Sequence, residues 1–196
     1  MEIIIHRINT IDELNTIDRN YGTEIDIRSL GSNLILNHDP YASGELLTDY
    51  LDEYNHGTLI LNIKESGIED TVLSLVKERP YIKSFFLLDI EFPFIYNASK
   101  LGEKKMAIRY SEFESIETVS SFINKVEWVW IDTFNKLPIL EPEKNVLNKF
   151  KKCLVCPERW DRKFDILNYK NELKNINFNI DAVMTSKTCI NNWLSS

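Results

Sequence analysis

Long apolar runs are missing from this chain of 196 residues. No apolar stretch approaches twenty residues, and the mean hydropathy is -0.25, so no membrane-spanning helix is expected. The start of the sequence, Met1 to Arg7, lacks the basic segment, the long apolar segment and the small-residue cleavage site of a signal peptide. We therefore expect a cytoplasmic protein.

Positive charge is also scarce, because the formal net charge is -7 and the isoelectric point is near 5.1. Binding along a nucleic-acid backbone needs concentrated positive charge, so we expect no nucleic-acid partner. A small phosphate-containing ligand needs only a local cationic pocket and stays compatible with this composition.

The chain has three cysteines, Cys153, Cys156 and Cys189. The first two have the spacing C-x-x-C, but no second pair or nearby histidine completes a zinc site. The pair also lies in an apolar run that is typical of a strand. We expect these thiols to be buried and structural.

The rest of the composition is that of an ordinary globular protein, with 43% apolar and 27% charged residues. This length allows a sizeable core and predicts a single domain over residues 1–196.

Apolar runs alternate with amphipathic stretches along nearly the whole chain. The expected strands are residues 2–6, 23–27, 34–37, 58–63, 83–88, 105–108, 128–131, 153–156 and 182–185. Most begin about 20–27 residues after the previous one, which is the length of a βα unit with short loops. Residues 34–37 break this spacing and are expected to extend the second unit as an excursion. The pattern predicts an α/β fold, a compact (β/α)8 TIM barrel. An open doubly wound sheet is the alternative, but the loop after the first strand has no glycine.

Four helix starts are indicated between these strands. Thr10 to Glu13 and Ser66 to Glu69 match the capping-box pattern. Pro142 can occupy a first helical position, and Asp161 can cap the helix that follows it.

Polar residues recur at the carboxyl ends of the expected strands, where barrels carry their chemistry. They are His6, Arg7, Glu24, Asp26, Arg28, His38, Asn62, Lys64, Asp89, Arg109, Asp132, Glu158 and Lys187. For Asp89, Arg109, Asp132 and Glu158, salt bridges between loops are an equally good interpretation. Trp128 and Trp130 alternate along a strand and are expected in the core. His56 fits a helix end and is assigned no chemistry.

Three short signatures in consecutive units predict one site: His6-Arg7, Glu24-x-Asp26 and His38-Asp39. Two of the three histidines of the chain lie in this set. Side chains alternate along a strand, so Glu24 and Asp26 share one face, as do Asn62 and Lys64. Inward carboxylates are costly unless a cation pairs with them, and here that cation is a metal ion, Arg7, Arg28 or Lys64. Taken singly, each signature could also be a surface pair, an outward strand face or a turn.

The order of these signatures resembles that of the glycerophosphodiester phosphodiesterase family, within the phosphatidylinositol-phospholipase-C-like superfamily of barrels. His6-Arg7 corresponds to the start of an H-R-G motif, Glu24 and Asp26 to E-x-D, and His38-Asp39 to H-D. Lys64 corresponds to the lysine of E-x-K, and residues 180–187 are similar to the last strand of the family. Short, divergent members also occur in bacterial surface-polysaccharide loci.

The resemblance implies roles for these residues. His6 and His38 would be the catalytic acid and base, with either assignment open, which suits the near-neutral pKa of histidine. Glu24, Asp26 and the position of Asn62 would hold Mg²⁺ or Ca²⁺, since hard cations prefer oxygen ligands. The cations Arg7, Lys64 and Arg28 would bind the phosphate of a small alcohol-phosphodiester, a glycerophosphodiester or a related surface-polymer precursor.

Two residues depart from the family pattern. Ile8 replaces the glycine after His6-Arg7, so the first loop is expected to follow a different backbone path. Asn62 replaces an acidic ligand, so the metal is expected to bind weakly or to be replaced by Arg28 or Lys64. Two other functions therefore remain open: a non-catalytic or regulatory barrel that keeps a phosphate pocket, and a phosphomonoesterase or transferase acting on sugar phosphates.

Overall fold

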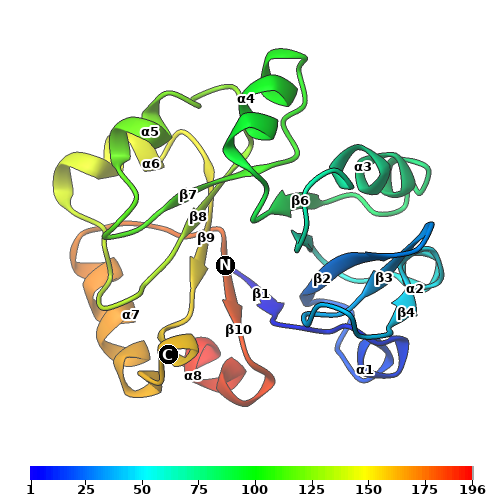
Figure 1. Ribbon diagram of the computed structural model, residues 1–196. Coiled ribbons are helices and arrows are strands. Elements are labelled where there is room, and N and C mark those ends of the chain that lie inside the picture. Colours follow the sequence, from blue (N-terminus) through cyan, green and yellow to red (C-terminus); the bar gives the residue numbers. More distant parts are fainter. Residues whose placement is uncertain (196) are drawn as a thin grey trace. The chain divides into compact units, whose positions relative to one another are not determined.

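The computed structural model describes residues 1–195, which form a mixed α/β fold (Figure 1). The strands in this part of the chain are β1 (Glu2–Ile5), β2 (Gly22–Leu30), β3 (Asn33–Leu36), β4 (Glu45–Leu46), β5 (Leu59–Ile63), β6 (Phe85–Leu88), β7 (Ala107–Tyr110), β8 (Trp128–Ile131), β9 (Lys151–Val155) and β10 (Ala182–Thr185). The helices are α1 (Ile11–Asn15), α2 (Leu47–Glu53), α3 (Glu69–Lys77), α4 (Phe92–Lys100), α5 (Ile116–Ser120), α6 (Lys144–Leu147), α7 (Ile166–Asn175) and α8 (Ile190–Leu194). No helix among these residues is long and apolar enough to cross a membrane.

The chain divides into two compact units. Ile4–Asn97 form the N-terminal unit, and Met1–Ile3 together with the chain from Ala98 onward form the C-terminal unit.

In the N-terminal unit, β2 is the central strand. It pairs in parallel with β1 and β5 and antiparallel with β3, while β6 pairs in parallel with β5 and β4 antiparallel with β3. The register between β2 and β5 places Asp26 opposite Asn62. This pairing brings two of the expected site strands together at their carboxyl ends.

In the C-terminal unit, the four strands β7, β8, β9 and β10 pair in parallel in chain order. Figure 1 shows α5, α6 and α7 along one side of these strands. The strands are buried almost throughout, as expected for parallel strands that are covered on both faces.

Most sequence-based predictions of local structure are confirmed. All nine expected strands exist, and residues 33–36 form the expected excursion, because β3 turns back antiparallel to β2. Thr10 caps α1, its hydroxyl oxygen accepting the backbone N–H of Glu13 at 3.2 Å. Trp128 and Trp130 lie in the core, as do the three cysteine thiols.

Two predicted caps are wrong. Ser66 does not cap α3. The carboxylate of Glu69 instead accepts the backbone N–H of Gly67 at 2.7 Å, and this local bond ends the preceding turn. Asp161 has a left-handed backbone (φ 58°) at the end of the 3-10 turn Pro157–Trp160, and α7 begins only at Ile166. The short strand β4 was not predicted, because two residues carry no period.

Nothing in the pairings among residues 1–195 shows a closed ring, so the (β/α)8 barrel and the single domain stay predictions.

Candidate active site

The first loop of the N-terminal unit turns sharply after β1. Arg7 has a left-handed backbone (φ 55°), which aims its N–H at Oε2 of Glu24, 2.8 Å away. Ile8 then returns to the interior, and its N–H donates to the carbonyl of Glu24. The residue with the left-handed backbone in this loop is therefore Arg7, and the different path expected from Ile8 stays a prediction.

Two carboxylates of β2 lie beneath this loop. Glu24 and Asp26 are almost completely buried, with 1% and 0% exposure, and lie two residues apart on β2, as expected for side chains that share one face. Nε2 of His6 lies 3.9 Å from Oε2 of Glu24, and Nε of Arg7 lies 3.7 Å from Oδ2 of Asp26. The first two signatures therefore meet in space.

Asn9 is a part of the site that sequence reasoning missed. Its amide nitrogen donates to Oδ2 of Asp26 at 2.9 Å, and its amide oxygen accepts the backbone N–H of Asp26 at 2.8 Å. These two hydrogen bonds hold Asp26 against the loop. A polar residue just before the cap Thr10 gives no sequence signal for such a role.

The end of β5 completes the surroundings of the two carboxylates. The side-chain amide of Asn62 donates to Oε1 of Glu24 at 2.8 Å, while its Oδ1 is buried and has no hydrogen-bond partner among the described residues. Nζ of Lys64 lies 3.1 Å from Oδ1 of Asp26 and 3.8 Å from Oδ2 of Asp89. Lys64 is therefore shared between two carboxylates.

His38 follows β3 in a loop that is closed by its neighbours. The side chain of Asn37 accepts the N–H of Asp39 and donates to the carbonyl of Ser43. Gly44 lies against β3 so closely that an added Cβ would be 2.1 Å from the carbonyl oxygen of Leu36. His38 is 42% exposed, and its Nδ1 lies 2.8 Å from Oδ1 of Asp39.

Arg28 connects this loop to the rest of the site through backbone carbonyls. Its Nε and Nη2 both donate to the carbonyl of His38, at 3.1 and 2.9 Å, and its Nη1 donates to the carbonyl of Lys64 at 3.2 Å. The structure thus brings together His6, Arg7, Glu24, Asp26, Arg28, His38, Asn62 and Lys64 through one continuous set of contacts.

Burial changes the charge of this site. Loss of solvent and the nearby Asp26 together raise the pKa of Glu24 from 4.5 to about 7, against the opposing hydrogen bonds from Asn62 and Arg7. The hydrogen bond from His38 lowers the pKa of Asp39. An ionised Asp39 can hold the Nδ1 proton of His38, leaving Nε2 to exchange protons.

The donor set does not fit a tightly held divalent ion. Both oxygens of Glu24 accept N–H donors, and those of Asp26 face Asn9 and the ammonium group of Lys64. Of the predicted ligands, only Asn62 keeps an oxygen without such a contact. Among the described residues, no three His, Cys, Asp or Glu side chains gather as a metal site.

The other strand-end residues of the C-terminal unit have local surroundings of their own. Arg109 bridges Glu114 and Asp132, at 2.7 and 3.0 Å, and the indole N–H of Trp160 also donates to Asp132. Glu158 accepts the hydroxyl of Thr185 and the N–H of Ser186. Lys187 is exposed at the start of a 3-10 turn.

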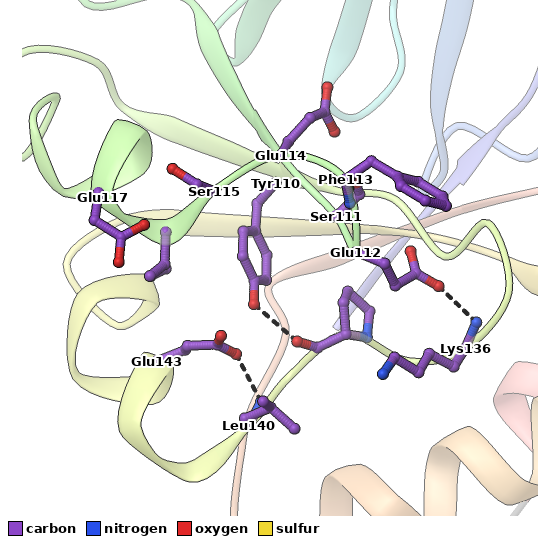
Figure 2. A pocket seen from close by; sticks show the side chains of 12 residues that line it. Tyr110, Ser111, Glu112, Phe113, Glu114, Ser115, Glu117, Lys136, Leu140 and Glu143 are labelled. Atoms are coloured by element: carbon purple, nitrogen blue, oxygen red, sulfur yellow. Dashed lines mark hydrogen bonds between the residues drawn. The ribbon is translucent and has the colours of Figure 1, made fainter.

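A pocket of about 400 Å³ also lies in the C-terminal unit (Figure 2). Its carboxylates are engaged locally: Glu112 accepts the backbone N–H of Lys136, and Glu143 accepts that of Leu140. None of the predicted site residues lines it. We assign this pocket no part in the chemistry of the candidate site.

Comparison with known proteins gives a fold but no family. No protein-family model matches the chain, and no curated protein does. A glycerophosphodiester phosphodiesterase from Agrobacterium tumefaciens strain C58 superposes with a TM-score of 0.66 and 12% identity, over 94% of this chain and 96% of its own. A putative glycerophosphoryl diester phosphodiesterase from the same strain gives 0.65 and 9%, over 94% and 92%. At these identities the likeness shows a shared fold.

Proposed function

We propose that the protein cleaves a small alcohol-phosphodiester with His6 and His38 as its proton-transfer groups. The observation that carries this proposal is the continuous set of contacts that links both histidine loops to the buried pair Glu24 and Asp26. The fold shared with two solved phosphodiesterases supports it, and also supports closure of the strands into the (β/α)8 barrel.

Two histidines suffice for the proton transfers of a phosphodiester cleavage. One removes the proton of the attacking hydroxyl or water, and the other protonates the leaving alkoxide as its bond to phosphorus breaks. Asp39 orients the ring of His38 through Nδ1, and the carboxylate of Glu24 lies next to His6. A pH–rate profile of each variant assigns the acid and the base.

Two cations of the chain would neutralise the phosphate. Lys64 and Arg7 both lie beside Asp26, with side chains that are 17% and 38% exposed. A buried counter-charge holds them in place before substrate arrives, and such preorganisation lowers the barrier for charge that develops on phosphoryl oxygens.

We propose that Mg²⁺ or Ca²⁺ binds only weakly at Glu24, Asp26 and Asn62 and is not required for turnover. Arg7 and Lys64 already balance the negative charge that an ion would need, and Asn62 supplies none. A local pair of cations, in a chain of net charge -7, suits a small diester rather than a nucleic acid.

The rival is a non-catalytic barrel that binds phosphate without turnover. The neutral Asn62 and the pairing of both cations with Asp26 favour it, because each reduces the charge left for a reacting phosphate.

The test compares wild type with His6→Ala and His38→Ala on a panel of glycerophosphodiesters. We expect each variant to lose about 100-fold or more in kcat, the usual contribution of a proton-transfer group. His56→Ala is the matched control, since His56 contacts the carbonyl of Ile17, outside the site. Binding of a diester by wild type without hydrolysis would instead establish the rival. Release of inorganic phosphate from a monoester, or transfer to an acceptor alcohol, would point to the other enzyme classes.

A further inference from the structure

Arg28 uses its guanidinium group in an unusual way for a cation beside a phosphate pocket. The three contacts that its nitrogens make at 2.9–3.2 Å all end on backbone carbonyls, two on His38 and one on Lys64. Its nearest carboxylate, that of Glu65, is 4.0 Å away, and the Arg28 side chain is only 17% exposed. The group is thus directed at two loops.

These two loops carry different parts of the proposed chemistry. His38 lies in the loop after β3, and Lys64 directly follows β5, whereas Arg28 belongs to β2 together with Glu24 and Asp26. A planar guanidinium group holds several acceptors in fixed directions, which a flexible ammonium group cannot do. A displacement of about 1 Å in a catalytic group can cost about 100-fold in rate.

We propose that Arg28 is a positioning residue, which holds the loops of His38 and Lys64 against β2 and does not bind the phosphate itself. This inference rests on the phosphodiesterase function proposed above.

The experiment replaces Arg28 by Lys, which keeps the charge but loses the planar fork, and by Gln, which loses both. For Arg28→Lys we expect kcat to fall about 10- to 100-fold with KM changed by less than about threefold. The affinity for inorganic phosphate should stay within about threefold in both variants, because the backbone N–H of Lys64 still donates to the carbonyl of Ile27 on β2. Lys64 and Arg7 therefore keep their contacts with Asp26.

A spectroscopic readout makes the test independent of turnover. The chain has three histidines, so ¹⁵N-detected imidazole signals can be assigned with the three alanine variants. We expect Arg28→Lys to shift the signals of His38 and leave those of His56 unchanged. If wild type shows no hydrolysis, the proposed function fails, and this measurement still decides the role of Arg28.

Arg79→Lys is the matched control for lost stability. Arg79 also donates to two backbone carbonyls and one carboxylate of the N-terminal unit, those of Leu75, Thr48 and Asp52. The Arg79→Lys substitution should leave kcat and the His38 signals unchanged. A rise of tenfold or more in KM and in the phosphate dissociation constant, with unmoved His38 signals, would show that Arg28 binds phosphate and would overturn the inference.

Discussion

In the N-terminal unit the strand-end carboxylates Glu24 and Asp26 are buried against two loops that also carry partly exposed His38 and Arg7. In the C-terminal unit the corresponding residues largely satisfy one another, as Arg109 does by bridging Asp132 and Glu114. Both units place polar residues at the carboxyl ends of parallel strands. Position at a strand end and a buried aspartate are therefore common to both units, since Asp132 is only 5% exposed. The difference is the second buried carboxylate beside Asp26, that of Glu24, whose pKa is raised.

This difference separates a site from a structural network. A buried carboxylate with a raised pKa costs stability, and such costs are concentrated where function requires them. The ion pair between Arg109 and Glu114, whose side chains are 30% and 32% exposed, contributes little and needs no functional reason. The pocket of the C-terminal unit contains none of the predicted site residues, and two of its carboxylates, Glu112 and Glu143, accept nearby backbone N–H groups (Figure 2).

The sharpest way to break the comparison is to neutralise one buried aspartate in each unit. Asp26→Asn and Asp132→Asn each remove a carboxylate that pairs with partly exposed cations, so both should lower the free energy of unfolding by about 1–3 kcal/mol. Only Asp26→Asn should also lower kcat by about 100-fold, because Lys64 and Arg7 lose their anchor.

Urea unfolding and initial rates on one diester measure the two effects separately. Equal losses of kcat in both variants would mean that the C-terminal network belongs to the chemistry after all.

The second prediction concerns Glu24. Folding raises its pKa from 4.5 to about 7, so between these pH values the folded chain holds a proton that the unfolded chain has released. The free energy of unfolding should therefore fall as pH rises from 4.5 to 7, by up to about 3 kcal/mol from this group. Glu24→Gln should remove this dependence. The glutamine amide can donate to Oδ1 of Asn62 once that side chain flips, so the variant keeps its hydrogen bonds.

Urea titrations from pH 4.5 to 8 with chelator present give the two curves. The exposed Glu53→Gln controls for the loss of one negative charge. Parallel curves for wild type and Glu24→Gln would contradict the raised pKa.

A smaller loss of stability is expected when one helix cap is removed in each unit. Thr10 and Ser115 cap α1 and α5, accepting the N–H groups of Glu13 and Thr118. Thr10→Ala and Ser115→Ala should each cost about 1 kcal/mol in thermal or urea unfolding. Thr10 follows Asn9, which donates to Asp26, so Thr10→Ala alone should also reduce kcat, by about 2- to 5-fold. An identical kcat in both variants would indicate that the Asn9 loop does not depend on its cap.

The smallest effect is expected from metal removal. Since Lys64 and Arg7 balance the carboxylate pair, chelation should change kcat by less than about twofold, and Mg²⁺ should bind with a dissociation constant above about 1 mM. Calorimetry and rates in chelator measure both values. Loss of activity in chelator with recovery on Mg²⁺ addition would restore a catalytic ion.

Much of this arrangement was predictable from the order of residues. The apolar runs predicted the strands, and the cap Thr10 predicted the start of α1, because burial along a strand and capping of a helix depend on residues close in sequence. The excursion after β2 was predicted from broken spacing. The predictions of caps at Ser66 and Asp161 were wrong. The carboxylate of Glu69 accepts the N–H of Gly67, and Asp161 ends a 3-10 turn with a left-handed backbone.

The sequence by itself determined the strands and the common face of Glu24 and Asp26. Only the tertiary structure decided which residues contact one another: Asn9 and Lys64 contact Asp26, and Arg28 donates to two backbone carbonyls. The reason is physical. Strand periodicity is a local property, whereas the partner of a buried charge depends on strand register and loop path, which long-range packing sets.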